Sequence, residues 1–136
     1  MLAKPDTVVE YPIQCLGGNY RSADGAQAAF SPDGTKFAWC GGPSGINLFD
    51  FDRCSGELTN PTHLPFYWTQ GLNYQFGLSF SPNSRFLYIA QTRYILQFDT
   101  WDSNISGSVD TIGYYQPPPD TPSLPGPFFL MQLAPD

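Results

Sequence analysis

An internal repeat constrains the fold of this chain more than any other feature of its sequence. The segment FSPD at residues 30–33 returns as FSPN at residues 80–83, an offset of 50 residues, and each is followed closely by a basic residue and a phenylalanine. The dipeptide FD at residues 49–50 returns at residues 98–99, an offset of 49. Because two separate anchors recur at nearly constant spacing, the sequence predicts one structural unit that occurs at least twice.

Each unit is expected to contain four short strands. In the first unit we place them in AQAAF (26–30), TKFAWC (35–40), INLFDF (46–51) and GELTNPTHLPF (56–66). In the second we place them in GLSF (77–80), RFLYIAQ (85–91), YILQFD (94–99) and GSVDTIGYY (107–115). Ser-Pro-Asp-Gly suits a type I turn, in which Gly34 accepts positive φ more easily than Ser84 does at the corresponding place. Pro61 and Pro65 suit an outer edge strand.

The second strands are apolar on consecutive positions, as in residues 37–39 and 86–89. A strand with one solvated face would alternate apolar and polar residues, so these runs favour sheets that are covered on both faces. Four antiparallel strands in about 50 residues, covered on both faces, describe one blade of a β-propeller. The expected fold class is therefore all-β: a β-propeller fragment of about two four-stranded antiparallel blades, with partial blades at both ends.

The repeat spacing also predicts how the chain is divided. We assign residues 1–27 to the end of a preceding blade and its connecting loop, 28–77 to the first complete unit and 78–130 to the second. Residues 131–136, MQLAPD, place Pro135 53 residues after Pro82 and are expected to start a third, truncated unit. The chain is then part of a longer ring, whose remaining blades, or self-association, cover the exposed blade faces.

Composition excludes several classes of function. The chain is 41% hydrophobic and 16% aromatic, which is enough apolar material for a packed core. Its six basic residues are scattered and its net charge is -6, so nucleic acid is not an expected partner. No apolar run is long enough to span a membrane, and the N-terminal MLAKPDTVVEYP lacks the apolar core of a signal peptide.

Few residues suggest chemistry. Asp50 and Asp52 form a DxD pair whose carboxylates could share one side of a strand and hold a cation, or could accept backbone hydrogen bonds in the following turn. The second unit does not repeat the pair, because Thr100-Trp101 follows Asp99. We expect the turn role, and we predict no catalytic residue, metal or cofactor.

The remaining polar candidates are isolated. The three cysteines, Cys15, Cys40 and Cys54, include no CxxC pair, so we expect thiols or a single disulfide rather than a zinc site. His63 has no nucleophile or carboxylate beside it in the sequence and is expected at the surface. Asn104-Ile105-Ser106 matches the N-glycosylation triplet, a pattern that arises often by chance.

Aromatic residues gather before the inner strand of the second unit. Tyr67, Trp68 and Tyr74 fall in a segment that would line one end of a propeller, where exposed rings stack on sugars or peptides. The alternative, which we favour, is that these rings fill the gap between adjacent blades.

The quoted segments resemble the YVTN/WD-like propeller repeats of large secreted proteins of Bacteroidetes, which carry PKD modules and a type IX secretion sorting domain. The likeness covers about residues 28–136 and is most specific in FDFDRCSGEL (49–58) and FSPNSRFLY (80–88). It implies a β-propeller at the cell surface or outside the cell, and it transfers a fold better than an activity.

The expected function is that of a non-catalytic propeller segment, a scaffold for binding or adhesion to a protein or glycan. Two alternatives remain open. One is a propeller lactonase or related hydrolase whose catalytic residues lie mainly on other blades, and the other is a structural spacer.

Overall fold

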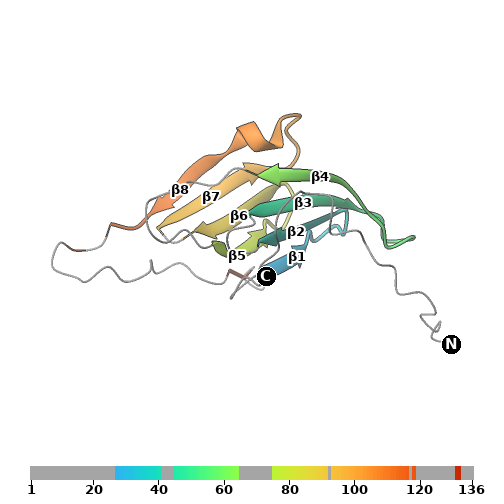
Figure 1. Cartoon of the computed structure of the whole chain (residues 1–136), viewed down its shortest axis with the longest axis horizontal. Helices are drawn as coiled ribbons and strands as arrows, with labels where there is room; N and C mark the ends of the chain where they lie inside the picture. Colours follow the sequence, from blue (N-terminus) through green and yellow to red (C-terminus); the bar gives the residue numbers. More distant parts are fainter. Residues whose placement is uncertain are drawn as a thin grey trace.

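The computed structural model describes residues 27–40, 45–64, 75–91, 93–116, 118 and 131–132, and these residues form two four-stranded antiparallel sheets (Figure 1). The first sheet has the strand order β1-β2-β3-β4 and the second has the order β5-β6-β7-β8. Each strand therefore pairs with its neighbour in sequence. The prediction of an all-β chain built from two four-stranded antiparallel units is confirmed.

The observed strands fall in the predicted segments. The first sheet consists of β1 (Gln27–Phe30), β2 (Lys36–Cys40), β3 (Ile46–Phe51) and β4 (Leu58–Leu64). The second consists of β5 (Gln75–Phe80), β6 (Phe86–Gln91), β7 (Tyr94–Asp99) and β8 (Asp110–Tyr114). Strand β5 begins two residues before the predicted segment, and a short 3-10 helix, η3 (Ile105–Ser108), precedes β8 without having been predicted.

The two repeated turns adopt the same backbone geometry. Gly34 has φ 69° and Ser84 has φ 62°, so both units need a left-handed residue where the chain leaves the turn. The predicted requirement for positive φ is confirmed, and Ser84 meets it at a steric cost that glycine avoids.

Strand pairing shows where the repeat offset changes from 50 to 49. Phe30 pairs with Phe37, and Phe37 with Phe49; in the second sheet Phe80 pairs with Leu87, and Leu87 with Phe98. Residues 41–45 lie between the paired Cys40 and Ile46, whereas only residues 91–94 lie between the paired Ala90 and Ile95. The connection after the second strand is thus one residue shorter in the second unit.

The register also shows how the basic residue after each turn is placed. Lys36 lies directly opposite Asp50, whereas the residue opposite Asp99 is Phe86 and not Arg85. Lys36 and Arg85, the basic residues that follow the two turns, therefore occupy neighbouring rather than equivalent positions, in agreement with the offset of 50 residues.

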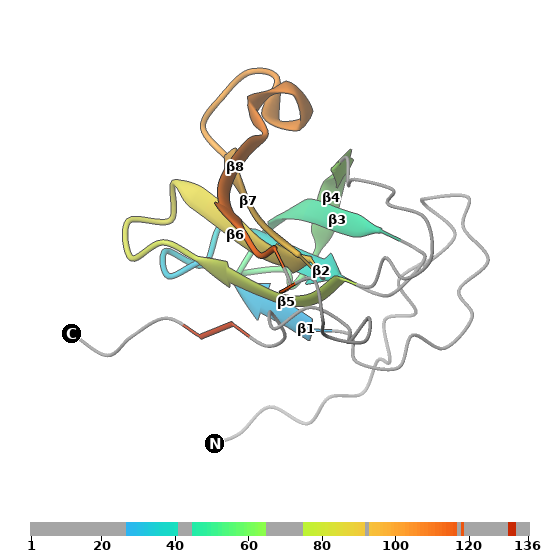
Figure 2. The ribbon, with the colours of Figure 1, turned by 90° about the vertical axis from the view of Figure 1, so that its left-hand side faces the viewer.

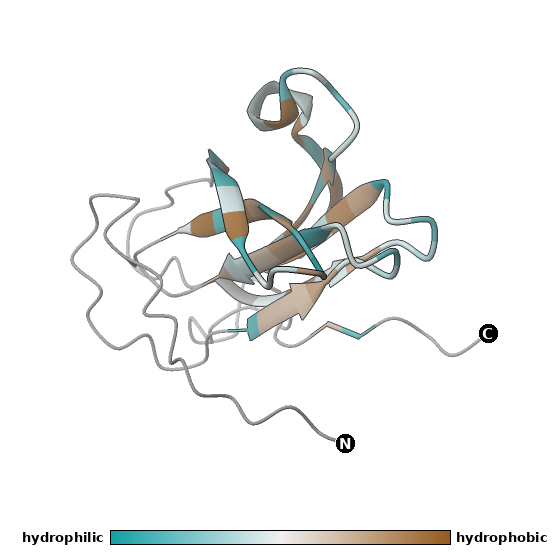
Figure 3. Ribbon diagram, turned by 90° about the vertical axis from the view of Figure 1, so that its right-hand side faces the viewer, coloured by the Kyte–Doolittle hydropathy of each residue, from teal (hydrophilic) through white to brown (hydrophobic). Residues whose placement is uncertain are grey.

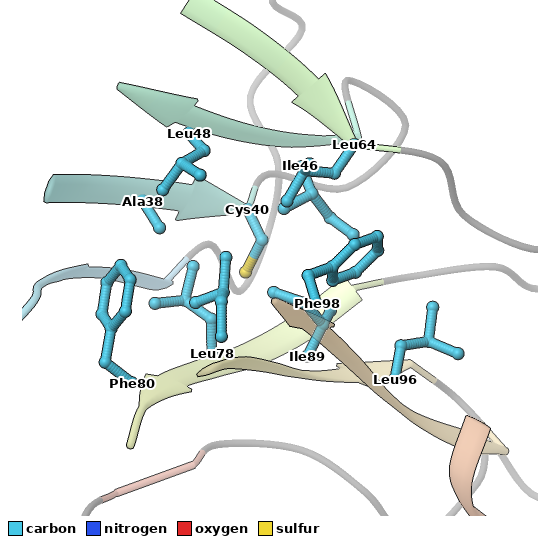
Figure 4. Close-up of a cluster of buried hydrophobic side chains, with 11 residues drawn as sticks. Ala38, Cys40, Ile46, Leu48, Leu64, Leu78, Phe80, Ile89, Leu96 and Phe98 are labelled. Atoms are coloured by element: carbon cyan, nitrogen blue, oxygen red, sulfur yellow. The ribbon is translucent and has the colours of Figure 1, made fainter. Parts of the chain in front are cut away.

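The hydrophobic core lies between the two sheets (Figure 4). We call the face of the first sheet that carries Ala38, and the equivalent face of the second sheet, the front face. The opposite face, which carries Leu87 in the second sheet, is the back face. The front face of the first sheet packs on the back face of the second. The front-face residues in the core are Ala38, Cys40, Ile46, Leu48 and Leu64, and the back-face residues are Leu78, Phe80, Leu87, Ile89, Leu96 and Phe98. Every one of these side chains is at most 3% exposed.

The space between the sheets is bounded at both sides. Strand β1 lies beside β5 at the inner side, and η3 reaches from the second sheet to β4 at the outer side (Figures 1 and 2). Ile105 and Val109 pack against the core there, and Ser106 Oγ donates to the His63 carbonyl at 3.1 Å. The helix thus connects the outer strands of the two sheets.

Strand β4 is an outer edge strand, as Pro61 led us to expect. Its pairing with β3 is interrupted between Leu48 and Asp50 by a β-bulge. Asn60 sits in this bulge with φ 49°, a conformation that asparagine tolerates better than most residues. Pro65, the second predicted edge proline, lies outside the described residues.

Candidate functional site

One end of the two sheets carries many charged and polar side chains. The β1–β2 and β5–β6 turns lie at this end, together with the loops that follow β3 and β7. In an antiparallel sheet of sequential strands, every second connection lies at the same end of the strands. We call this surface, residues 31–35, 52–57, 81–85 and 100–104, the turn end. Figure 3 shows the contrast between apolar strands and the hydrophilic β5–β6 turn.

The two turns are held by the same network of hydrogen bonds. Ser31 Oγ donates to Asp33 Oδ1 at 2.6 Å and accepts from the Lys36 amide at 2.9 Å. In the second unit Ser81 Oγ donates to Asn83 Oδ1 at 2.7 Å and accepts from the Phe86 amide at 2.9 Å. The repeated Ser-Pro-Asp/Asn sequence is thereby explained by turn chemistry.

A direct hydrogen bond joins the two turns. The Asp33 amide donates to Ser84 Oγ at 3.0 Å, across the boundary between the sheets. Burial alone would raise the pKa of Asp33, but hydrogen bonds from Ser31 and Thr35 outweigh it and lower that pKa below its ordinary value. Asp33 is therefore a carboxylate that serves the structure of its turn.

The two carboxylates of the DxD pair have separate partners. Asp50 forms an ion pair with Lys36 and accepts from Asn60 Nδ2 at 2.7 Å. Asp52 lies beyond the end of β3, where its Oδ1 accepts from the Cys54 amide at 2.7 Å and from the Ser55 amide at 3.3 Å. The pKa of Asp50 is lowered by the hydrogen bond from Lys36, and that of Asp52 by the Cys54 amide. Both carboxylates thus serve the sheet and its turn.

The second unit builds a related cluster around Arg85. Its Nε and Nη2 donate to Asp99 Oδ2 at 3.0 and 2.7 Å, and its guanidinium carbon lies 5.0 Å from the ring centre of Phe86 and 5.6 Å from that of Trp101. Asp99 Oδ1 accepts from the Trp101 amide at 3.0 Å. The hydrogen bond from Arg85 lowers the pKa of Asp99. Arg85 therefore forms the ion pair with Asp99 and also contacts the exposed indole of Trp101.

Trp101 is the most exposed large hydrophobic side chain of the described residues, at 64%. It combines a solvent-facing aromatic ring with charged neighbours, the combination that stacks on sugars and on peptide side chains. Trp101 was not identified from the sequence, because Thr100-Trp101 was considered only as the place where the second unit lacks the DxD pair. The signal available in the sequence was a tryptophan in a polar loop.

The aromatic residues that the sequence did single out, Tyr67, Trp68 and Tyr74, lie outside the described residues. Their assignment to ligand contact or to packing stays a prediction.

His63 and Asn104 both take part in local structure. His63 Nδ1 lies 3.1 Å from Asn47 Oδ1, on the neighbouring strand β3. Asn104 caps η3, since its Oδ1 accepts from the Gly107 amide at 3.1 Å. The glycosylation triplet therefore coincides with a helix cap.

Two of the three cysteines can be placed. Cys40 is a buried free thiol in the core, and burial raises its pKa, whereas Cys54 is an exposed free thiol in the loop after β3. Cys15 lies outside the described residues. A raised pKa makes the Cys40 thiol a poor nucleophile at neutral pH.

Within the described ranges, no group of three or more His, Cys, Asp or Glu side chains is arranged to hold a metal ion. The same part of the chain contains no helix with the length and apolarity that a membrane crossing requires. No protein-family profile matches this sequence, and no curated protein matches it.

Proposed function

We propose that this chain contains two consecutive blades of a β-propeller and serves, outside the cell or at its surface, as a non-catalytic scaffold that binds a protein or glycan. One observation carries the proposal: two equivalent four-stranded sheets stack front to back, with their first strands side by side. This is the stacking by which four-stranded blades are arranged around a common axis.

Four carboxylates in the turn end or next to it favour a scaffold over a hydrolase. The carboxylates of Asp50 and Asp99 are held in ion pairs, and those of Asp33 and Asp52 accept hydrogen bonds from their own turns. Depressed pKa values keep these four groups ionised at neutral pH, whereas a general acid needs a raised one. These carboxylates hold the sheets and turns together, and their pKa values do not suit a general acid.

A binding role, as opposed to that of a spacer, is supported by Trp101. An indole that is 64% exposed is poorly used as packing material, and Arg85 holds it in place at the turn end. A preorganised aromatic ring binds a ligand at a smaller loss of conformational entropy than a mobile one. We therefore assign the ligand contact of the described residues to Trp101 and Arg85.

The test is a binding screen with the full chain. The immobilised protein is exposed to a glycan array and to a display library of peptides, in parallel with Trp101→Ala and Tyr114→Ala. Tyr114 is a matched control, because it is also exposed, at 54%, but lies on β8 at the far end of the sheet.

We expect one ligand class to be retained by the wild type and by Tyr114→Ala, and to bind Trp101→Ala about tenfold more weakly. A screen that retains neither glycan nor peptide would count against the scaffold function. Equal loss in both variants would remove the assignment to Trp101.

A further inference from the structure

The back face of the first sheet carries a cluster of aromatic side chains that points away from the core. Phe30 lies 4.9 Å from Phe37 and 4.7 Å from Phe51, measured between ring centres, and Phe37 lies 6.3 Å from Phe49. Phe30 is 52% exposed, and the other three rings are partly buried. Such a contiguous apolar surface is typical of an interface.

The repeat indicates what kind of surface this cluster fits. By strand register, Phe30, Phe37 and Phe49 correspond to Phe80, Leu87 and Phe98 of the second sheet. All three counterparts are at most 3% exposed, because the front face of the first sheet covers them. The first-sheet residues thus differ from their counterparts in exposure, since Phe30 is 52% exposed and Phe37 and Phe49 are only partly buried.

The matching surface is present on the same chain. The front face of the second sheet carries Tyr88, Ala90, Ile95 and Gln97, at the positions that Ala38, Cys40, Ile46 and Leu48 occupy in the first sheet. Tyr88, Ile95 and Gln97 are partly buried, and Ala90 is 1% exposed. Among the described residues, no third sheet packs on the back face of the first sheet or on the front face of the second, although Asn47 and Ala90 on these faces are each 1% exposed. These two faces are of the types that already pack together inside the chain.

From this equivalence we propose that the chain associates head to tail with a second copy of itself, the front face of the second sheet of one copy packing on the aromatic back face of the first sheet of another. This inference rests on the blade-pair part of the proposed function. The contact is heterologous, so repeated association yields closed rings or open chains and not only dimers.

The contact cannot reproduce every interaction of the internal interface. Ser84 Oγ accepts from the Asp33 amide between the two sheets, but glycine stands at the corresponding position 34. The turn-to-turn hydrogen bond is therefore missing from the intermolecular contact, and the aromatic cluster must supply the association by burial of apolar surface.

The experiment uses two single variants of the full chain and their mixture. Phe30→Glu places a charge on the back face of the first sheet, and Tyr88→Glu places one on the front face of the second sheet. Each variant keeps one intact face. Tyr114→Glu, on strand β8, is the control for a charge on an exposed aromatic elsewhere. Masses are measured by light scattering over a concentration series, and circular dichroism checks that each variant is folded.

We expect the wild type and Tyr114→Glu to exceed the monomer mass as concentration rises, and each of the two face variants alone to be monomeric. Their equimolar mixture should reach the mass of a dimer and stop there, because one intact front face meets one intact back face. If Phe30→Glu does not fold, Phe30→Ser replaces it, since the removal of the exposed ring introduces no charge.

A wild type that stays monomeric at every concentration, with its sheets intact by circular dichroism, would overturn head-to-tail association and leave the scaffold function standing. Association that persists in Tyr88→Glu but not in Phe30→Glu would indicate back-to-back pairing and would equally overturn it. Loss of ligand binding in the screen described above, with association retained, would remove the scaffold function alone.

Discussion

The turn residues Gly34 and Ser84 both adopt the left-handed backbone conformation that their turns require, but they differ in side chain. Both adopt positive φ, which costs a side chain about 1 kcal/mol or more relative to glycine. Ser84 offsets part of this cost, because its hydroxyl accepts from the Asp33 amide and joins the two sheets. At Gly34 an added Cβ would meet the Cδ atom of Arg53 at 2.6 Å, so a larger residue is disfavoured by space as well as by φ.

The two turns should therefore respond differently to substitution. Gly34→Ala is expected to lower the free energy of unfolding by about 1–2 kcal/mol, from positive φ and from the displacement of Arg53. Ser84→Gly should change it by less than about 0.5 kcal/mol, because relief of backbone strain and loss of one hydrogen bond nearly cancel. Urea denaturation checks both values. An equal destabilisation by the two variants would contradict this account of the turns.

Acid should weaken the fold through the carboxylates that are held in ion pairs. The pKa of Asp50 is lowered in the folded state by Lys36 and Asn60, so its contribution is present above the unfolded pKa of about 3.9 and is lost as pH falls through the folded pKa. Asp50→Asn should accordingly be less stable than the wild type at pH 6, with the difference shrinking below about pH 4.

Denaturation midpoints at a series of pH values measure this difference. Asp110→Asn is the control, since Asp110 is an exposed carboxylate at the start of the edge strand β8. If the difference in stability between the wild type and Asp50→Asn stayed constant from pH 6 to pH 3, the ionised form of Asp50 would not contribute to stability.

At the level of strands, local patterns were sufficient to predict most of the fold. The segments INLFDF and YILQFD are the observed β3 and β7, because runs of β-branched and aromatic residues between turn sequences favour short strands. The pattern did not indicate which face of each sheet would be buried, since consecutive apolar residues such as Phe86 and Leu87 look alike in sequence. Only packing of the second sheet on the first distinguishes them.

Other features escaped prediction because they depend on contacts between distant residues. Helix η3 forms from Ile105–Ser108, a segment with little helical pattern, where Ile105 reaches the core and Ser106 reaches β4. The exposed Trp101 cluster depends on the guanidinium of Arg85, from the β5–β6 turn. The sequence shows that the offset changes from 50 to 49, but the place of this change, between β2 and β3, became visible only in the strand register.

Gln27 connects segments that are far apart in sequence. Its Oε1 accepts from the Leu78 amide at 3.1 Å and from the Met131 amide at 3.3 Å, while its Nε2 donates to the Met131 carbonyl at 2.8 Å. A glutamine side chain carries the same amide group as the backbone and can therefore replace one residue of a strand pair. Ala28, Leu78 and Met131 are equivalent in the repeat, because each precedes a proline (Pro32, Pro82 or Pro135) by the same number of positions. The side chain of Gln27, the neighbour of Ala28, therefore contacts the equivalent residues at the next two places in the repeat.

Loss of this side chain should loosen the inner strands. In Gln27→Ala the Leu78 amide loses its acceptor, and we expect its hydrogen exchange to speed up by about tenfold, the equivalent of one hydrogen bond of about 1.4 kcal/mol. Gln27→Glu keeps the acceptor and should preserve protection at Leu78 better than the alanine variant. Exchange measured by NMR at Leu78, with Leu96 on β7 as internal reference, tests this. Unchanged protection at Leu78 would refute the role of Gln27.

For the whole molecule, the shared core determines how the two sheets depend on each other. A single sheet of four strands has one large apolar face that water would otherwise solvate, and here each sheet covers that face for the other. In repeat proteins of this type, stability is the sum of the stability of each unit and of the interface between them. The interface contains nearly all of the buried apolar side chains described here. We therefore expect the interface to contribute more to the free energy of unfolding than either sheet does by itself.

The consequence is that a defect on one side of the interface should destabilise both sheets. Leu96→Ala removes a fully buried side chain from the second sheet and is expected to cost about 2–5 kcal/mol. Hydrogen exchange should then speed up in β2 and β3 of the first sheet as much as in β6 and β7. Ile112→Ala, an exposed position on β8, serves as the control and should change neither sheet. If protection fell only in the second sheet, the two units would unfold independently, and neither the front-to-back interface nor a ring built from it would be the main source of stability.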